Sequence, residues 1–247
     1  MRDGLRSAVA AVTFLTAVPI GRRTEVRASD LRGGVVLFPV IGALVGALTA
    51  AVAWGAALAL PPLPAASLGV AAGVLVTAAM HLDGLADTAD GIGAALSGGD
   101  PSAAMHDPRL GVFGGAALAL DLLLKISVVS ALVAGPRFPL EAIAAGALGR
   151  AVAIALMTGL PYVGTGTGAW SRGSPFAPCL AGIGIASILG VFAVGPAFGP
   201  MAVAAVVVAA VVGRWSHRSL GGATGDTLGA AVELTETLAL TAALALR

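Results

Sequence analysis

The chain has 247 residues, of which 57% are hydrophobic and 11% are charged, and its formal net charge is +1 at neutral pH. Soluble domains carry about 25% charged residues, so this composition excludes an ordinary soluble protein and indicates a polytopic membrane protein. The low net charge, without Lys or Arg clusters interleaved with aromatic residues, excludes nucleic-acid binding, and the single cysteine, Cys179, excludes an internal disulfide.

The N-terminal segment is short for a membrane span. Arg2 and Arg6 precede an apolar run that Pro19 ends, as in the first two regions of a signal peptide, but no small-residue cleavage site follows. Residues 5–20 also fall short of the roughly 20 residues that a span needs. We expect an interfacial or re-entrant helix that stays on the protein.

The remaining apolar segments are long enough to cross a bilayer, and Pro- and Gly-rich turns separate them. We predict an all-α, polytopic membrane helical bundle with about six to seven transmembrane helices, formed as one domain over residues 1–247. Its abundant small residues suit close helix packing and permit a homo-oligomer. The predicted spans are residues 34–60, 64–82, 110–134, 140–160, 178–198, 200–215 and 228–246.

Lys and Arg in short loops set the orientation. Arginines crowd the chain before the first long span, so we expect a cytoplasmic N-terminus in the inner membrane of a prokaryote. Counting forward, segments 83–109, 161–177 and 214–227 also face the cytoplasm, which places every polar motif on that side. The cytoplasmic arginines are Arg2, Arg6, Arg22, Arg23, Arg27, Arg32, Arg109, Arg172, Arg214 and Arg218, against Arg137 and Arg247 opposite.

Three aspartates follow the second predicted span directly. Asp83, Asp87 and Asp90 are spaced i, i+4 and i+7, so on a helix their carboxylates share one stripe. Such a stripe repels itself unless a cation neutralises it, and Mg²⁺ takes carboxylate oxygens while keeping substrate phosphates as further ligands. The motif therefore predicts a Mg²⁺-phosphate site at the membrane surface. His81 beside it is a candidate general base or a positioning residue.

Two further polar clusters lie downstream. In the first, Asp107 and Arg109 precede the third span, and Arg109 is either a bidentate phosphate ligand or a positive-inside anchor. In the second, residues 221–229 form a glycine-rich turn that opens a helix and exposes backbone N–H groups to an anion. It is not a Walker A loop, because the Gly-Lys-Ser/Thr ending is absent. Asp226 in this turn is a site residue or an N-cap.

Charged residues inside spans are costly and therefore informative. Asp121 and Lys125 are i, i+4 and could neutralise each other. Arg150 has no partner nearby in sequence, which suggests an inward-facing counter-charge. Glu233 and Glu236 lie in an otherwise apolar terminal helix, where exposure to lipid would be costly.

Taken together, these motifs resemble the cobalamin synthase family, also called adenosylcobinamide-GDP ribazoletransferase, over nearly the whole chain. The resemblance is carried by residues 81–91, the 107–111 segment, Lys125 and residues 221–230, with residues 32–42 in support. Two residues depart from the family pattern. His106 stands where Arg or Lys is common, and Pro108 where Ser is common, which weakens the second cluster as a phosphate site.

The resemblance implies transfer of the adenosylcobinamide phosphate group from adenosylcobinamide-GDP to α-ribazole or its 5′-phosphate, with release of GMP. It implies one or two Mg²⁺ ions on Asp83, Asp87 and Asp90, and catalytic roles for Asp83, Asp226 and His81. The implied substrate-binding residues are Arg109, Asp107, Lys125, Arg150, Gly222, Thr224 and Gly225.

Two other interpretations of the sequence remain. Mg²⁺-dependent phosphotransferases of the CDP-alcohol type also carry spaced aspartates in a membrane helix, and intramembrane prenyltransferases use two such motifs. Here the residues after Asp83-Gly84 depart from the first pattern and the second motif of the other is missing. An ion-coupled transporter would also place charges inside spans. In this chain, however, the polar residues concentrate on the cytoplasmic face, and no inverted repeat is evident.

Overall fold

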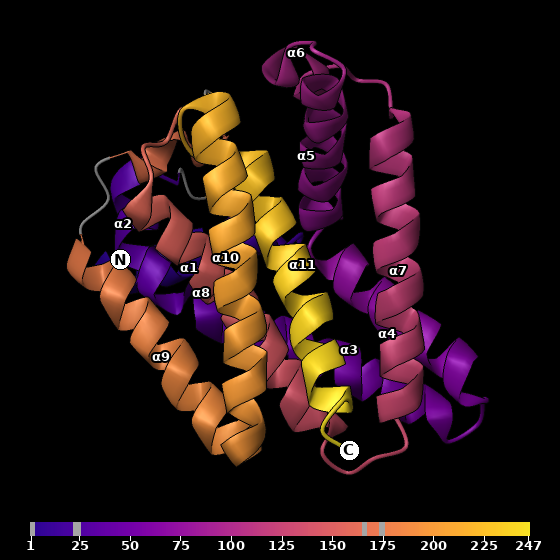
Figure 1. Ribbon diagram of the computed structural model, residues 1–247. Coiled ribbons are helices and arrows are strands. Elements are labelled where there is room, and N and C mark those ends of the chain that lie inside the picture. Colours follow the sequence, from indigo (N-terminus) through magenta and orange to yellow (C-terminus); the bar gives the residue numbers. More distant parts are fainter. Residues whose placement is uncertain (1–2, 22–25, 165–166, 173–175) are drawn as a thin grey trace.

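The computed structural model describes residues 3–21, 26–164, 167–172 and 176–247, and within these ranges the chain is a bundle of helices (Figure 1). The only extended pairing there is an isolated parallel bridge between Tyr162 and Ala223. The predicted all-α fold is therefore confirmed. Arg2, Arg22 and Arg23, used in the orientation argument, lie outside the described residues.

The α-helices, in chain order, are α1 Asp3–Leu15, α2 Ala28–Gly34, α3 Phe38–Ala57, α4 Pro62–Val76, α5 Met80–Leu96, α6 Pro101–Met105, α7 Val112–Leu132, α8 Phe138–Gly159, α9 Phe176–Val194, α10 Phe198–Leu220 and α11 Gly225–Leu244. The 3₁₀ turns are η1 Pro19–Gly21, η2 Val35–Leu37, η3 Thr167–Ser171 and η4 Gly195–Ala197.

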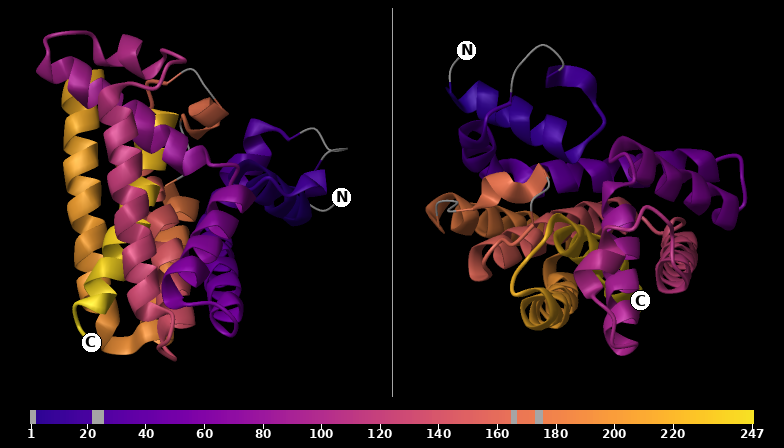
Figure 2. Two further views of the ribbon diagram at one scale, coloured as in Figure 1. Left: turned by 90° about the vertical axis from the view of Figure 1, so that its right-hand side faces the viewer. Right: turned by 90° about the horizontal axis from the view of Figure 1, so that it is seen from above.

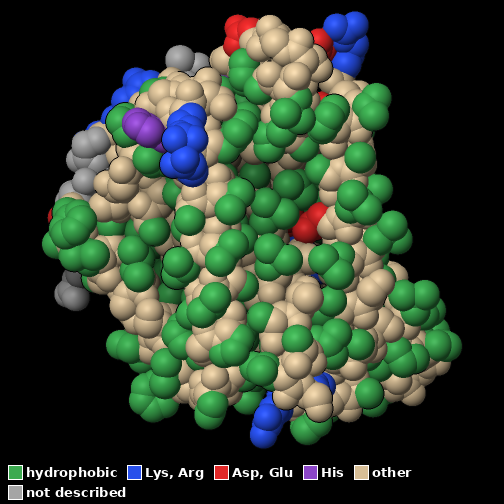
Figure 3. Space-filling model, in the orientation of Figure 1, with side chains coloured by type: hydrophobic (Ala, Val, Ile, Leu, Met, Phe, Trp, Pro, Cys, Tyr) green, Lys and Arg blue, Asp and Glu red, His purple; other side chains and the backbone are tan. Residues whose placement is uncertain are grey.

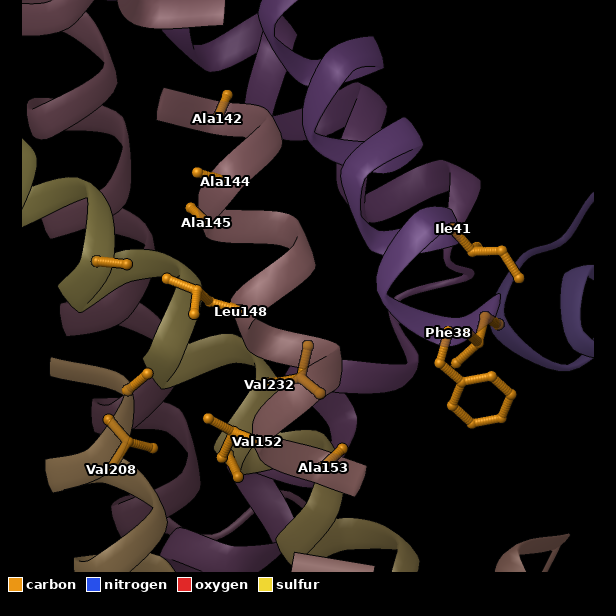
Figure 4. Close-up of a cluster of buried hydrophobic side chains, with 14 of the residues drawn as sticks. Phe38, Ile41, Ala142, Ala144, Ala145, Leu148, Val152, Ala153, Val208 and Val232 are labelled. Atoms are coloured by element: carbon orange, nitrogen blue, oxygen red, sulfur yellow. The ribbon is translucent and has the colours of Figure 1, made fainter. Parts of the chain in front are cut away.

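Helix α8 forms the centre of the bundle. In its most apolar 18-residue stretch, 83% of the residues are buried. Leu148 and Val152 of α8 lie in one hydrophobic core with Val208 of α10 and Val232 of α11 (Figure 4). Glycines bring α8 against α3, because a Cβ on Gly42 would collide with the backbone carbonyl of Gly146. Packing through small residues is how membrane helices approach closely.

Length and composition give five candidate membrane spans among the described residues, or up to six if α4 and α5 count as one bent span. One candidate, residues 176–220, contains both α9 and α10, and the chain turns back between them at η4 (Figure 1). The polytopic architecture is thus confirmed.

The predicted continuous span at residues 64–82 is wrong. Helix α4 ends at Val76, and α5 leaves it at an angle of 88°. Two consecutive alanines make this corner in the left-handed region, Ala78 at φ 51° and Ala79 at φ 58°. Left-handed backbone is unfavourable for alanine, which is not a helix breaker, so hydropathy gives no sign of the corner. The corner turns α5 away from α4, and α5 packs against α11.

The N-terminal helix is shorter than expected. It ends at Leu15, is not a candidate span, and lies with α2 on one flank of the bundle (Figure 2). Phe14 at its end stacks on Phe38 of α3, with ring centroids 5.8 Å apart. This contact ties the flank to the rest of the bundle.

The surface agrees with a membrane environment. On the face shown in Figure 3, hydrophobic side chains cover a broad band, and Lys and Arg side chains lie toward its ends. Exposed leucines and valines on α7 and α10, such as Leu120, Leu123, Val203 and Val207, contribute to the apolar exterior. Large exposed apolar areas of this kind are typical of surfaces that contact lipid rather than water.

Candidate active site

The site is built where α5 crosses the first turn of α11. A Cβ on Gly84 would lie 2.6 Å from the carbonyl oxygen of Asp226, so only glycine permits this approach. Gly229, one turn further along α11, faces the same crossing, and a Cβ there would lie 3.5 Å from the Cα of Gly84. The two glycines thus bring Asp83 and Asp226 from distant parts of the chain to one place.

Asp83, next to this crossing, lines two cavities. The first, here called the aromatic cavity, has a volume of about 190 Å³. The predicted residues Asp83, Asp226, Arg150, His81 and Gly225 form the polar part of its lining. The apolar part of its lining comes from Phe14, Leu15, Phe38, Ala153, Met157, Trp170, Leu228 and Val232, and Ser171 follows Trp170.

The second cavity, here called the open pocket, lies between α5 and the segment that leads into α7, and has a volume of about 540 Å³. It brings together four of the predicted residues with His106, whose role the sequence left open. The polar residues that line it are Asp83, Asp87, His106, Asp107 and Arg109.

Asp83 and Asp87 present carboxylates that other side chains leave available. Within the described ranges, no hydrogen bond or ion pair engages either side chain, Asp83 is exposed and Asp87 is half-buried. Asp83, Asp226 and Asp90 all lie within electrostatic range of Asp87, as does His106. These oxygens are therefore available to a cation, and their mutual repulsion favours one.

Asp90 has a different role. Its Oδ2 accepts a hydrogen bond from the backbone N–H of Gly111, and its Oδ1 accepts one from Gly114, both at 2.8 Å. Asp90 thereby caps the N-terminus of α7, where unpaired N–H groups favour a carboxylate. A Cβ at either glycine would collide with Asp90, which explains both glycines as packing positions.

Arg109 is paired with Asp107. Its Nε donates to Asp107 Oδ1 at 3.0 Å and its Nη2 donates to Oδ2 at 2.7 Å. These hydrogen bonds lower the pKa of Asp107 to about 2, so the pair persists until the pH falls through that value. The Arg109 side chain is 88% exposed, and such a surface pair is weak enough to exchange for a phosphate.

The glycine-rich turn has mainly structural partners. Gly221 ends α10 with φ 82°, and a Cβ on Gly222 would collide with the carbonyl of Pro161. Thr224 is the N-cap of α11, accepting a hydrogen bond from the N–H of Thr227 at 3.2 Å. The N-cap interpretation of Asp226 is therefore wrong. Asp226 lies in the first turn, and its side chain is left for the aromatic cavity.

The charges inside the spans form one buried ion cluster, consisting of Lys125, Arg150, Glu233 and Glu236. Lys125 pairs with Glu233 and lies 3.6 Å from Glu236, which also pairs with Arg150. The expected Asp121–Lys125 pair does not form, since Lys125 pairs with α11 and Asp121 accepts a hydrogen bond from Thr237 at 2.7 Å. The cluster joins α7, α8 and α11, and its member Arg150 also lines the aromatic cavity.

Among the described residues, no group of three His, Cys, Asp or Glu side chains is placed to hold a metal. Mg²⁺ does not require one, because it is usually bound through one or two carboxylates plus substrate phosphates. The available, hard oxygens of Asp83 and Asp87 fit that chemistry. Asp90, with both oxygens engaged, fits it less well.

Sequence reasoning missed the aromatic side chains that line the aromatic cavity. Phe14, Phe38 and Trp170 come from α1, α3 and η3, so no local pattern connects them. Trp170 lies in the glycine-rich segment after the fourth predicted span, part of which, residues 165–166 and 173–175, lies outside the described residues. Aromatic residues make up 4% of the chain. Their scarcity was the one signal in the sequence that could have pointed to these three side chains.

Comparisons with known proteins agree with one another. The family described as Cobalamin-5-phosphate synthase matches residues 7–244. A protein of Ralstonia pickettii named adenosylcobinamide-GDP ribazoletransferase is 37% identical, covering 97% of this chain and 95% of its own length. Proteins with the same name from Klebsiella pneumoniae and Escherichia coli are each 37% identical, covering 97% and 95% of this chain and 100% and 98% of their own. No solved structure matches.

Proposed function

The chain belongs to the cobalamin-5-phosphate synthase family, and from this premise we propose how its residues carry out the adenosylcobinamide-GDP ribazoletransferase reaction. It is a transferase of cobalamin biosynthesis, as its relatives' names and its full-length match to the family indicate. That match favours this activity over the CDP-alcohol and transporter interpretations of the sequence. In the proposed enzyme, one cavity holds the acceptor and the other holds the pyrophosphate.

In the proposed reaction, a ribose ring hydroxyl of the acceptor attacks the phosphorus on the cobinamide side of the pyrophosphate. The nucleophile is not the expected 5′-hydroxyl, because that position is esterified in α-ribazole 5′-phosphate. A new O–P bond forms, the bridging P–O bond breaks, and GMP leaves with the bond's electron pair. The hydroxyl proton passes to a base on the protein. Positioning and charge stabilisation account for most of the catalysis of such transfers.

We assign the pyrophosphate to the open pocket. Asp83 and Asp87 would hold Mg²⁺ there together with phosphate oxygens, and the ion would neutralise charge on the pyrophosphate. Arg109 can release Asp107 and donate to a phosphate oxygen, since planar guanidinium suits bidentate phosphate binding. His106 lines the same pocket, and its Nδ1 hydrogen-bonds to the carbonyl oxygen of Ser102 at 2.6 Å, which leaves Nε2 for the pocket.

We assign the role of general base, which accepts the proton of the attacking hydroxyl, to Asp226. It lines the aromatic cavity beside Asp83, where an attacking hydroxyl has to lie, and its carboxylate is half-buried. His81, the rival base, is 5% exposed and lies toward the ion cluster, within electrostatic range of Arg150 and Lys125. We therefore give His81 a positioning role. Asp226→Asn should lower kcat more than His81→Gln does.

A single observation carries the proposal: Asp83 lines both cavities, at the point where Gly84 lets α5 meet α11. A residue at this junction can contact an acceptor in one cavity and a phosphate donor in the other. Substrates held on either side of such a junction gain the rate advantage of proximity.

The test is a mass-spectrometric assay of the purified protein with adenosylcobinamide-GDP, α-ribazole and Mg²⁺. We expect GMP and a cobalamin in equal amounts, loss of both with EDTA, and their return when Mg²⁺ is restored. Asp83→Asn should reduce turnover at least ~100-fold without unfolding the protein. Absence of product from folded wild-type protein with either form of α-ribazole would overturn the proposal.

A further inference from the structure

We propose that the apolar side chains of the aromatic cavity bind the heteroaromatic base of the acceptor nucleoside, with Trp170 and Ser171 as its specificity-determining residues. This inference rests on the proposed function, because it assigns one of that reaction's two substrates to a place. It adds a subsite whose aromatic side chains and Ser171 belong to none of the motifs found in the sequence.

The walls of the cavity suit a flat ring. Phe14 and Phe38 are stacked, with an interplanar angle of 18°, and Trp170 meets both rings edge-on at centroid distances of 5.6 and 5.8 Å. These side chains come from three separate elements in a chain with few aromatic residues. Aromatic side chains that line a cavity can stack on a planar aromatic ligand or meet it edge-on.

Two hydrogen-bonding groups in this wall are unsatisfied. The indole N–H of Trp170 and the hydroxyl of Ser171 are buried and have no hydrogen-bond partner within the part of the chain that the structure describes. The residues are 7% and 3% exposed, respectively. Buried polar groups in native proteins nearly always have partners, so two unpaired neighbours beside a cavity indicate a ligand that supplies them.

Arg150 in the lining of the same cavity shows the same feature. Arg150 is 1% exposed, and its Nε and Nη2 are without a hydrogen-bond partner in the described ranges although Nη1 pairs with Glu236. In the proposed complex, the base lies against Trp170 and the sugar hydroxyls lie by Arg150, Asp83 and Asp226. One cavity thus provides both apolar and charged groups, as a nucleoside requires.

Size and polarity favour the acceptor base over the other aromatic groups in the reaction. About 190 Å³ is smaller than the roughly 300–1,000 Å³ of sites for drug-sized ligands, so the cavity suits one bicyclic base and excludes a corrin ring. Guanine carries several polar edge groups, which Phe14, Phe38 and Met157 would leave unpaired at a cost. A benzimidazole-type base is apolar apart from one free ring nitrogen, which Trp170 N–H can satisfy.

The first test measures binding alone. The chain has three tryptophans, Trp54, Trp170 and Trp215, so Trp54→Phe/Trp215→Phe leaves Trp170 as the only indole. Titration of this variant with α-ribazole, without donor substrate or metal, should change the Trp170 fluorescence saturably. Adenosylcobinamide-GDP alone should not. No response to α-ribazole, from protein that is folded by circular dichroism, would overturn the inference.

The second test is kinetic. Trp170→Phe keeps the aromatic ring and removes the N–H, so the KM for α-ribazole should rise about tenfold, the scale of one lost hydrogen bond. The KM for adenosylcobinamide-GDP and kcat should stay within about twofold. An acceptor with carbon in place of the free ring nitrogen should lose this sensitivity to Trp170→Phe. Trp54→Phe, at a residue 58% exposed, is the matched control.

The outcomes separate this inference from the proposed function. If the wild-type protein makes no product but α-ribazole still quenches Trp170, the cavity assignment stands and the reaction is wrong. If the wild-type protein is active and Trp170→Phe raises the KM of the donor substrate instead, the reaction stands and the cavity assignment is wrong.

Discussion

The three aspartates of α5 meet different partners, although they recur along one helix. Asp83 and Asp87 present available carboxylates to the open pocket, whereas both oxygens of Asp90 accept backbone N–H groups of α7. A cation-binding carboxylate is destabilising until the cation arrives, but a capping carboxylate stabilises the fold in every state. Activity and stability should therefore respond to different members of the same motif.

Replacing each residue in turn tests this separation. Asp90→Ala should lower the free energy of unfolding by about 0.5–2 kcal/mol, the usual cost of a lost cap. Asp87→Ala should leave the thermal midpoint unchanged or raise it, because repulsion from Asp83 is relieved, while turnover falls. The midpoints are measured by thermal unfolding in detergent, alongside the GMP assay. Equal losses of stability from both variants would contradict the assignment.

At the scale of elements, the crossing of α5 and α11 decides where chemistry can occur. The left-handed corner at Ala78 and Ala79 directs α5 toward α11, and Gly84 allows the two backbones to meet. Thr224 caps α11, which fixes the helix start and leaves the side chain of Asp226 in the cavity. The placement of the acidic side chains at this crossing therefore depends on small residues that have no catalytic group of their own.

Gly84→Ala should therefore impair catalysis by displacement alone. A Cβ 2.6 Å from the Asp226 carbonyl forces the helices apart, and misplacement of about 1 Å can cost about 100-fold in rate. We expect a ten- to hundredfold fall in kcat from protein that remains folded. Gly184→Ala on α9 is the matched control, since a Cβ there meets nothing within 4 Å. Undiminished turnover in Gly84→Ala would show that the crossing does not position the site.

Over the whole molecule, the buried ion cluster links the spans to the site. Two cations and two carboxylates from α7, α8 and α11 balance one another, and Arg150 belongs to both the cluster and the aromatic cavity. Removing one member of a buried pair leaves an uncompensated charge, which costs about 3–5 kcal/mol. Removing one cation together with one carboxylate leaves the cluster neutral.

A double-mutant cycle on Lys125 and Glu233 checks this balance. Lys125→Met alone should lower the free energy of unfolding by about 3–5 kcal/mol. Lys125→Met with Glu233→Gln should be less destabilised than the sum of the single variants, because Arg150 and Glu236 still compensate each other. Unfolding in detergent gives the free energies. Strict additivity would mean that the two side chains do not interact in the folded protein.

The orientation in the membrane is a further property of the whole molecule. Helix α6 lies at one end of the bundle, and the α7–α8 connection lies at the other with the C-terminus (Figure 1). The arginine distribution favours a cytoplasmic position for the α6 end. A membrane-impermeant maleimide should therefore label Ser102→Cys in inside-out vesicles and Ala134→Cys in intact spheroplasts. The native Cys179 is 1% exposed and gives little background. The reverse pattern would invert the proposed orientation.

The sequence was most informative about composition and short motifs. Apolar segments of span length predicted the helical membrane bundle, because a bilayer leaves the backbone few alternatives. The aspartate spacing placed Asp83 and Asp87 in the candidate site, since residues three or four apart on a helix share a face. The glycine-rich turn that opens a helix placed Asp226 there. The corner at Ala78 was not predictable, because alanine carries no turn signal.

By itself, the sequence determined that this chain is an all-α membrane protein of a recognisable family with acidic motifs suited to phosphate chemistry. Composition and helical spacing are local properties, and they are readable without knowing which helices touch. Only the tertiary structure decided that Asp90 caps α7, that Lys125 pairs with α11 rather than with Asp121, and that Trp170 faces the same cavity as Asp83. Each of these depends on contacts between helices far apart in the chain, where the packing of small residues selects the partners.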